Sequence, residues 1–582
     1  MTITQQPQTA SFAGAYEDSR VLAQWLRRFG GVVAMYVAVT LATGATWMGD
    51  TVDYVESIVY YNHGIDHWMW DFAHLLWRPL GWLVSVIVAP LTRLVVGRSE
   101  SLNVMLTLNA ISWIAGLAAL LALFSLATHF SGRAWIAYTV AAGFLFTQSV
   151  LNWTHAGSAY IPGLALLLAA LQLMVLDRQQ TRRTAIISGI LLAAAVCVWV
   201  PYLLVVPAVV LAPAILSGAT RARLRAAVYA FAAFTICTGI AYLAVMGAQH
   251  MTSIQQLRDW IALSSHGVDY HGGKRMIFGY TRAFLNTGND GVMFKRYLLH
   301  DPFNPVTLRD LLGATIWKIA FVHLFSAILV VKLFATNKRL FVLFAIAAMP
   351  VLTLAFFFGS SEPERYLPLV PVFFMAIASC LATPSRFFRS ATLAFLAAVI
   401  AVNSAAMAKP VLDRDADRAA ARVGALIPRL DDRSIVFTAT YQDELMTFAR
   451  TYPFHALNRS GRLHVSTLVS PGTSWNEHWC EDFASRVLTT WKRGGTTWVA
   501  LRVRSERPLA DWRWSEGDDA RVSWHDFPLL FSHVDLGESV GGSDGFVQLL
   551  PTSKNKQFLS TLTTPALIAE RNSARSQSAS HN

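Results

Sequence analysis

Acidic side chains gather directly after the first long apolar run of the sequence. The stretch from residue 49 to residue 80 holds five carboxylates before its first base, Arg78: Asp50, Asp53, Glu56, Asp66 and Asp71. An ionised carboxylate in hydrocarbon costs about 3 kcal/mol, so carboxylates at the mouth of a membrane helix must face water or line a cavity. The chemistry that such a group offers is proton transfer, with the carboxylate as a general base.

Asp50 is the candidate base of this stretch, because it comes first after the apolar run. A carboxylate is ionised outside the membrane, and partial burial tunes its basicity. Asp53 follows three residues later, so on a helix the two side chains would share a face. The alternative is that both are ordinary solvated residues at the membrane surface.

A second polar group precedes a late apolar run, where Arg365 follows Glu364 and is followed by Tyr366. A guanidinium fork matches the oxygens of a phosphate, so Arg365 is a candidate phosphate ligand. The alternative is an interfacial arginine that snorkels to the surface beside Glu362 or Glu364. Further bases in external positions offer the same chemistry, with simple solvation as the alternative: Arg78, Lys274 and Arg275.

Histidines near these loops raise the question of a metal. The spacing of His63, His67, His74 and His155 fits no zinc motif of the His-Glu-x-x-His kind. We therefore interpret them as polar interfacial side chains rather than ligands. The sequence indicates no cofactor with certainty, and a divalent cation near Asp53 stays open.

The composition indicates which elements must position these residues. Of 582 residues, 54% are hydrophobic and only 14% are charged. The apolar residues form repeated runs of roughly 20 residues, the length that crosses a bilayer as a helix, whereas a membrane β-barrel would show short alternating strands. The net charge of +12 comes mainly from bases in short loops between these runs. Such bases set topology, so we predict a polytopic α-helical membrane protein and no nucleic-acid partner.

The distribution of bases orients the spans. Arg20, Arg27 and Arg28 precede the first apolar run, so residues 1–28 are predicted to be a cytoplasmic tail. A transmembrane domain then covers residues 29–409, with external loops at 49–102 and 247–311. We expect about eleven spans: residues 30–48, 103–127, 134–151, 158–176, two short helices within 184–217, then 226–246, 312–333, 340–358, 367–382 and 391–407.

One further apolar run, residues 80–96, is not counted as a span. Pro79 and Pro90 interrupt it, and arginines flank it on both sides. If it crossed the membrane, the basic loop at residues 177–183 would fall outside. We therefore predict that this run forms juxtamembrane helices that lie along the outer surface.

The composition changes after residue 409, where charge rises and no run is long enough to span. Short apolar strands are predicted at residues 433–438, 496–503 and 545–550, with a helix at 442–450. Residues 410–552 are thus expected to form a small α/β domain outside the membrane. The Ser/Thr/Asn-rich residues 553–582 are predicted to be a disordered tail.

Three short motifs resemble those of a known superfamily. They are Gly49–Tyr54 after the first span, Arg78–Leu80 together with Val96–Ser101 before the next span, and Glu364–Pro371 at the start of a late span. Their order and shared external face make the chain resemble the GT-C superfamily of integral membrane glycosyltransferases. That superfamily includes protein O-mannosyltransferases, aminoarabinose transferases and the catalytic subunits of oligosaccharyltransferases. The likeness covers residues 20–410.

The resemblance implies a function at the external face of the cytoplasmic membrane of a cell with a glycan-bearing envelope. The donor would be a polyprenyl-phosphate-linked sugar, and the acceptor a lipid, a glycan or a protein. Transfer would invert the anomeric centre, with Asp50 as base and Asp53 as a second catalytic residue. Residues expected to contact the substrate are Arg365, Tyr366, Glu364, Arg78, His155, Lys274 and Arg275.

Two other classes of function stay open. A lipid or polysaccharide transporter usually places charges in the middle of broken helices and shows paired repeats, whereas here the ionisable residues gather at one face. A non-catalytic envelope-glycan assembly protein would keep the fold without the activity. It is favoured by the loop at residues 152–158, which lacks the second acidic residue that the superfamily often has there.

Overall fold

The structure is a computed structural model in which part of the chain is described. The residues described are 29–43, 49–64, 69–96, 100–177, 179–264, 275–287, 293, 297, 306–312, 316–412, 421–431, 433–438, 464–467, 479–501, 526–543 and 545–579.

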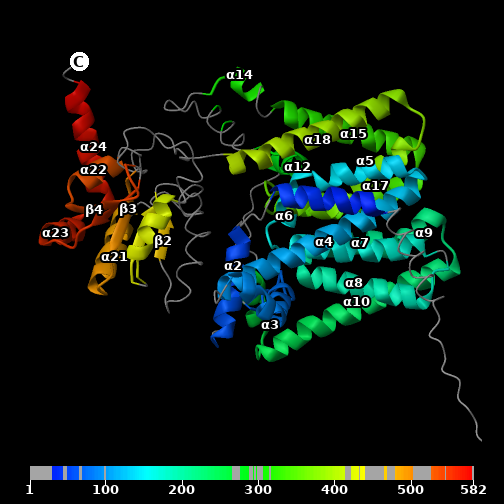
Figure 1. Cartoon of the computed structure of the whole chain (residues 1–582), viewed down its shortest axis with the longest axis horizontal. Coiled ribbons are helices and arrows are strands. Elements are labelled where there is room, and N and C mark those ends of the chain that lie inside the picture. The colour runs from blue at the N-terminus through cyan, green and yellow to red at the C-terminus, as the bar shows by residue number, and fades with distance from the viewer. Residues whose placement is uncertain are drawn as a thin grey trace, which may run out of the picture.

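The larger part of the molecule is a bundle of long apolar helices that lie side by side (Figure 1). Among the described residues, seven helices are long and apolar enough to cross a membrane. These are α4 (Glu100–Ser131), η1 with α9 (Val200–Val205 and Val206–Ser217), α10 (Arg221–Ala248), α15 (Trp317–Thr336), α16 (Lys338–Phe357), η4 with α17 (Pro363–Leu369 and Val370–Leu381) and α18 (Arg386–Leu412). The chain is therefore a multi-pass membrane protein.

The remaining helices of the bundle are shorter or bent. The pair α5 (Ala134–Leu145) and α6 (Gln148–Thr154) bends by 67° and counts as an eighth span if taken as one unit. The helix Phe29–Thr43, α7 (Tyr160–Leu176) and α8 (Arg182–Val198) complete the bundle. Every span predicted from the sequence thus corresponds to one helix or one bent pair, and the predicted fold class is confirmed.

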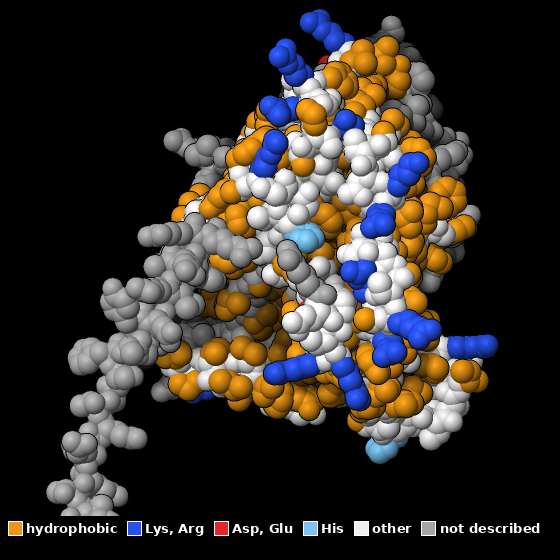
Figure 2. Space-filling view, turned by 90° about the vertical axis from the view of Figure 1, so that its right-hand side faces the viewer, with side chains coloured by type: hydrophobic (Ala, Val, Ile, Leu, Met, Phe, Trp, Pro, Cys, Tyr) orange, Lys and Arg blue, Asp and Glu red, His pale blue; other side chains and the backbone are white. Residues whose placement is uncertain are grey.

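One end of the bundle is basic. Figure 2 looks at this end and shows Lys and Arg side chains spread across it. They lie where consecutive helices join, and all but Arg133 fall near the start of the following helix: Arg133, Arg182, Arg183, Arg221, Arg225, Lys338, Arg339, Arg386 and Arg389. The guanidinium of Arg339 donates to the carbonyl oxygen of Leu216 at 3.1 Å, which ties two of these turns together.

The opposite end carries α2 (Gly49–Asn62) and α3 (Trp77–Val96), and α2 runs across the bundle instead of along it (Figure 1). The first part of the predicted external loop is therefore a helix, which corrects the expectation of a loop there. The reason is that Tyr54, Val55, Ile58 and Val59 recur at helical spacing and are buried against the bundle.

The helix α3 has the character predicted for a juxtamembrane helix. Leu83, Ile87, Leu91 and Leu94 fall on one side of it and are exposed. An apolar stripe of this kind at the end of a membrane bundle is typical of a helix that rests in the bilayer interface. The second external loop also contains helices: α11 (Ile254–Ser264), α12 (Met276–Phe284) and α14 (Leu308–Leu311).

The C-terminal region forms a five-stranded sheet beside the end of the bundle that carries α2 (Figure 1). Its order is β2-β1-β3-β5-β4, with β1 parallel to both β2 and β3 and β5 antiparallel to both β3 and β4. The strands are β1 (Ile435–Thr438), β2 (His464–Thr467), β3 (Thr497–Ala500), β4 (Leu536–Val540) and β5 (Phe546–Leu549). Three of the five fall within the predicted strands, and the predicted helix at 442–450 lies outside the described residues.

The C-terminal tail differs from the sequence-based expectation of disorder. Residues 553–579 are mostly helical, as α23 (Ser553–Thr561) and α24 (Thr564–Ala579). The Thr552 hydroxyl accepts from the backbone N–H of Asn555 and caps α23. Leu559, Leu562 and Leu567 then join the core of the sheet region. The prediction of disorder rested on the polar composition of this segment, which hides the few apolar side chains that pack on the core.

Candidate functional site

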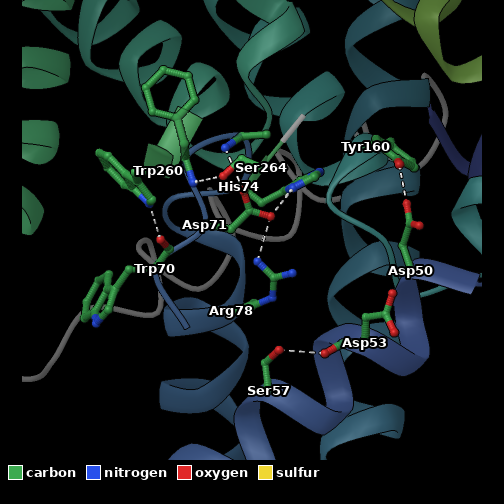
Figure 3. A network of polar contacts seen from close by, with 12 residues as sticks. Asp50, Asp53, Ser57, Trp70, Asp71, His74, Arg78, Tyr160, Trp260 and Ser264 are labelled. Carbon is green, nitrogen blue, oxygen red and sulfur yellow. Dashed lines mark hydrogen bonds and ion pairs between the residues drawn. The ribbon is translucent and has the colours of Figure 1, made fainter. Parts of the chain in front are cut away.

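The candidate base Asp50 lies in the first turn of α2, at the end of the bundle away from the basic turns. Its carboxylate is half-buried, and Oδ2 accepts a hydrogen bond from the Tyr160 hydroxyl at 2.5 Å (Figure 3). The neighbouring Thr51 hydroxyl donates to the carbonyl oxygen of Ala156, which fixes the start of α2 against the turn before α7. Asp53, one turn further along α2, is exposed. Of the two predicted catalytic carboxylates, only Asp50 faces the bundle.

Aromatic rings surround the tyrosine that contacts Asp50. The ring of Tyr160 packs edge-on against Trp153, at 4.6 Å between centroids, and against Trp199, at 4.7 Å. The backbone carbonyl of Tyr160 accepts from the Tyr202 hydroxyl at 2.6 Å. Tyr54 stands one turn after Asp50 on α2 and is buried beside the ring of His74, at 5.5 Å. The wall behind Asp50 is thus aromatic and firmly packed.

The late motif that contains Glu364 and Arg365 lies at the same end of the bundle as Asp50. Arg365 and Glu364 lie on the 3₁₀ helix η4, where the sequence predicted the approach to an α-helix. Arg365 Nε pairs with Glu362 Oε2 at 3.0 Å and stays partly exposed. Glu364 lies within electrostatic range of Asp50, and Arg365 lies within electrostatic range of Tyr160. The acidic residue Asp50 and the late motif therefore lie at the same end of the bundle, with Tyr160 between them.

Tyr366 serves to hold η4 in place. Its ring is fully buried, and its hydroxyl donates to the carbonyl oxygens of Ser360, at 2.8 Å, and Met276, at 3.3 Å. Gly279 on α12 packs so closely here that a Cβ would overlap the carbonyl oxygen of Ser360. The predicted contact of Tyr366 with a substrate stays a prediction, because this hydroxyl is engaged with the backbone.

A small apolar cavity of about 10 Å³ lies beside η4. Its lining comes from α7, η1, α9, α16, η4 and α17 and includes Pro368 and Pro371. Pro368 lies three residues after Arg365, about one turn of the 3₁₀ helix. Arg365 and a small cavity lined by apolar side chains therefore share one short element.

Arg78 is committed to an ion pair that the sequence did not predict. We call residues 70–78, between α2 and the start of α3, the strap. Within it, Asp71 Oδ2 lies 2.8 Å from Arg78 Nη1 and 3.1 Å from His74 Nδ1 (Figure 3). Asp71, His74 and Arg78 are only 4%, 6% and 5% exposed, so all three charges or dipoles are neutralised locally. Arg78 is not available to a phosphate in this arrangement.

The surroundings of Asp71 also set its protonation. Burial alone would raise the pKa of Asp71, but this is outweighed by the hydrogen bond and charge of His74, the charge of Arg78 and the Ser264 hydroxyl. Together they hold the pKa of Asp71 well below its usual range. The carboxylate is therefore ionised at neutral pH despite its burial.

The strap is anchored by its own backbone as well. The Leu76 N–H donates to the carbonyl oxygen of Cys197 at 2.9 Å, and the Val200 N–H donates to that of Ala73 at 3.0 Å. These bonds use the break between α8 and η1, where backbone groups lack helical partners. On the other side, Trp260 of α11 donates to the carbonyl oxygen of Trp70 at 2.7 Å (Figure 3). The strap thus joins α2, α8, η1 and α11.

The other predicted contact residues are spread out. His155 is fully buried, with Nδ1 at 2.8 Å from the Leu151 carbonyl oxygen and Nε2 at 2.7 Å from the Thr43 hydroxyl. Arg275 is exposed just before α12, and Lys274 lies outside the described residues. Within the described ranges, no group of three or more His, Cys, Asp or Glu side chains is placed to hold a metal ion.

Two residues of this end were missed by sequence reasoning. Tyr160 looked like one of many interfacial aromatics, and no local pattern distinguished it. Asp71 was counted in the acidic stretch without a role. Spacing gave a weak signal there, since His74 and Arg78 follow at intervals of three and seven residues, but Asp71 and His74 lie before α3 begins at Trp77.

Comparisons with solved structures found ArnT from Cupriavidus metallidurans. For ArnT bound to undecaprenyl phosphate, the identity is 12%, the match covers 84% of this chain and 97% of that chain, and the TM-score is 0.48. For ArnT in the apo state, the identity is 12%, the match covers 81% and 93%, and the TM-score is 0.39. Likeness of this degree transfers no residue role to this chain. No protein-family model and no curated protein matches it.

Proposed function

We propose that this protein is a membrane glycosyltransferase that moves a sugar from a polyprenyl-phosphate donor to an acceptor hydroxyl or amine at the external face of the membrane. The observation that carries the proposal is the position of Asp50. Its carboxylate is half-buried at the end of the bundle, accepts a hydrogen bond from Tyr160, and lies within electrostatic range of Glu364, the neighbour of Arg365 on η4. A general base and a cation for a phosphate are parts that such a transfer needs.

The chemistry uses these groups in a single displacement. The acceptor atom attacks the anomeric carbon from the face opposite the phosphate, and its bond to that carbon forms while the carbon–oxygen bond to the phosphate breaks. The electron pair of the broken bond leaves on the polyprenyl phosphate, and the proton of the acceptor passes to Asp50. The anomeric centre is inverted, and Arg365 stabilises the negative charge that grows on the departing phosphate.

The donor lipid has a place in this arrangement. Arg365 would release its ion pair with Glu362 and turn to the phosphate, since both side chains are partly exposed. The isoprenoid chain would then extend from η4 into the surrounding hydrocarbon of the bilayer. Glu364 and the external helices α11 and α12 frame the acceptor side, and the C-terminal sheet region lies beyond the same end of the bundle.

The decisive test is Asp50→Asn in the full-length protein. Membranes that contain the wild type, supplied with radiolabelled polyprenyl-phosphate mannose or aminoarabinose, are expected to release polyprenyl phosphate and to label an acceptor. Asp50→Asn keeps the shape but cannot take a proton, so we expect at least about a 100-fold loss of transfer. Glu56→Gln, another carboxylate replacement on α2, is the matched control and should retain activity.

Three results would contradict the proposal. Full transfer by a folded Asp50→Asn protein would remove the base from the mechanism. A folded wild type that releases no polyprenyl phosphate from either donor would favour the non-catalytic assembly protein instead. Transport of the donor across sealed vesicles without cleavage of the sugar–phosphate bond would identify a lipid transporter.

A further inference from the structure

We propose that Tyr160 is the positioning residue of Asp50: its hydroxyl occupies one carboxylate oxygen, fixes the plane of the carboxylate, and leaves the other oxygen aimed at the acceptor. This inference rests on the proposed function, because it assumes that Asp50 takes the proton. It adds a residue from a different helix, α7, for which the sequence gave no role.

The hydrogen bond itself is the first argument. Tyr160 donates to Oδ2 of Asp50 at 2.5 Å, and it does so from the first residue of α7. Among the described residues, Oδ1 of Asp50 has no recorded hydrogen-bond partner. A carboxylate with one oxygen occupied by a donor has a fixed plane, and its remaining lone pairs point in a defined direction.

The second argument is that Tyr160 has little freedom to move. It is 5% exposed, and its ring is held between Trp153 and Trp199. The Tyr202 hydroxyl grips its backbone carbonyl at 2.6 Å. A donor that is held this firmly needs no reorganisation when a proton arrives at its partner, which is the property expected of a preorganised site.

The third argument comes from the charges around the pair. The titratable and charged groups nearest to Tyr160, apart from Asp50, come from three elements: Tyr54 on α2, His74 on the strap, and Glu364 and Arg365 on η4. None of these four groups hydrogen-bonds to Asp50 in the described part of the structure, so the Tyr160 hydroxyl is the group that orients the carboxylate.

The test is Tyr160→Phe, which keeps the ring and its aromatic neighbours and removes only the hydroxyl. We expect transfer to fall about tenfold and the acidic limb of the pH–activity profile to move to higher pH by about one unit. Tyr202→Phe removes the hydrogen bond to the Tyr160 carbonyl oxygen. It should lower the transfer rate and move the acidic limb in the same directions as Tyr160→Phe, but by smaller amounts. Tyr229→Phe, which removes a hydroxyl from a ring that lies beside Arg182 near the basic end of the bundle, is the matched control.

Thermal unfolding in detergent checks that each variant folds. A folded Tyr160→Phe protein with wild-type rate and wild-type pH profile would overturn the inference. A lower rate with an unmoved acidic limb would also overturn it, because that result assigns Tyr160 a packing role only. If Asp50→Asn stays active, the proposed function fails first; if Asp50→Asn is inactive while Tyr160→Phe behaves as the wild type, only this inference fails.

Discussion

At the scale of single residues, Asp71 shows how this protein accommodates a buried charge. Its two partners, Arg78 and His74, share the oxygen Oδ2, while Oδ1 accepts from the backbone N–H of Ala73 at 2.9 Å. The strap therefore holds a buried ion pair in which both carboxylate oxygens of Asp71 are occupied, although His74 Nε2 and Arg78 Nε are buried without a hydrogen-bond partner. Such a pair is stable only while all its members are present. Removing one partner leaves the other charge buried and uncompensated.

We predict that Asp71→Asn destabilises the protein by about 3 kcal/mol, because Arg78 would keep its charge without a counterion. Thermal or denaturant-induced unfolding of the full-length protein in detergent measures this change. Asp259→Asn on α11, whose carboxylate is exposed and accepts from Gln255, is the control and should alter stability by less than about 0.5 kcal/mol. Equal stability of the two variants would show that the ion pair contributes little.

The pH dependence of the same residue has a definite sign. The folded protein holds the pKa of Asp71 below its unfolded value of about 4, so the ionised carboxylate stabilises the fold fully above that pH. Below about pH 4 the unfolded chain binds a proton before the folded one does, and the contribution is lost. The stability difference between the wild type and Asp71→Asn should therefore shrink as the pH falls from about 5 to about 3.

At the scale of elements, the site depends on the contacts that fix the position of η4. This 3₁₀ helix carries Glu364 and Arg365. Its own Tyr366 anchors it through a hydrogen bond to the Ser360 carbonyl oxygen, and α12 packs against it. The close approach of α12 is possible because residue 279 is a glycine. The position of Arg365 is thus set by a contact between two segments that are far apart in the sequence.

We predict that Gly279→Ala displaces η4 and lowers both stability and transfer. A methyl group there would overlap the Ser360 carbonyl oxygen, and overpacking against backbone costs about 1–3 kcal/mol. The Michaelis constant for the lipid donor should rise, because Arg365 moves with η4. Gly247→Ala on α10, where a Cβ meets nothing, should instead leave the activity unchanged and stabilise the helix slightly. Equal donor affinity in the two variants would argue against a role for this contact.

At the scale of the whole molecule, the two ends of the bundle differ in chemistry. The basic turns lie at one end (Figure 2), and α2 and α3 lie at the other (Figure 1). By the positive-inside rule we expect the basic end to face the cytoplasm. Asp50 and Arg365 are then expected to face the external side, as the proposed reaction requires.

Cysteine labelling tests this orientation. In a protein whose native cysteines are replaced by alanine, Ala219→Cys, in the turn before α10, should react with a membrane-impermeant maleimide only after the membrane is opened. Thr252→Cys, just before α11, should react in intact cells. Both positions are exposed, so accessibility within the protein does not separate them. The reverse pattern would place the site in the cytoplasm and exclude an external transferase.

The sequence alone predicted a good part of this picture. The spans, the surface helix at α3 and the strands β1, β3 and β5 follow from local apolar patterns, which need no knowledge of distant residues. The helix over Asp50 and the helices α23 and α24 were not predicted, because in both places polar composition outweighed a few apolar positions at helical spacing. The pairing of Arg78 with Asp71 was missed because it depends on a turn that composition does not specify.

The sequence by itself determined that this chain crosses the membrane many times, which end is basic, and that carboxylates and a late arginine belong to the opposite end. Composition and charge decide these properties, because placing any charged side chain in hydrocarbon costs free energy whatever its neighbours in the sequence are. Only the tertiary structure decided that Asp50 accepts a hydrogen bond from Tyr160, that Arg78 pairs with Asp71, and which contacts fix the position of η4. These are contacts between segments up to hundreds of residues apart, and they depend on packing that no local pattern encodes.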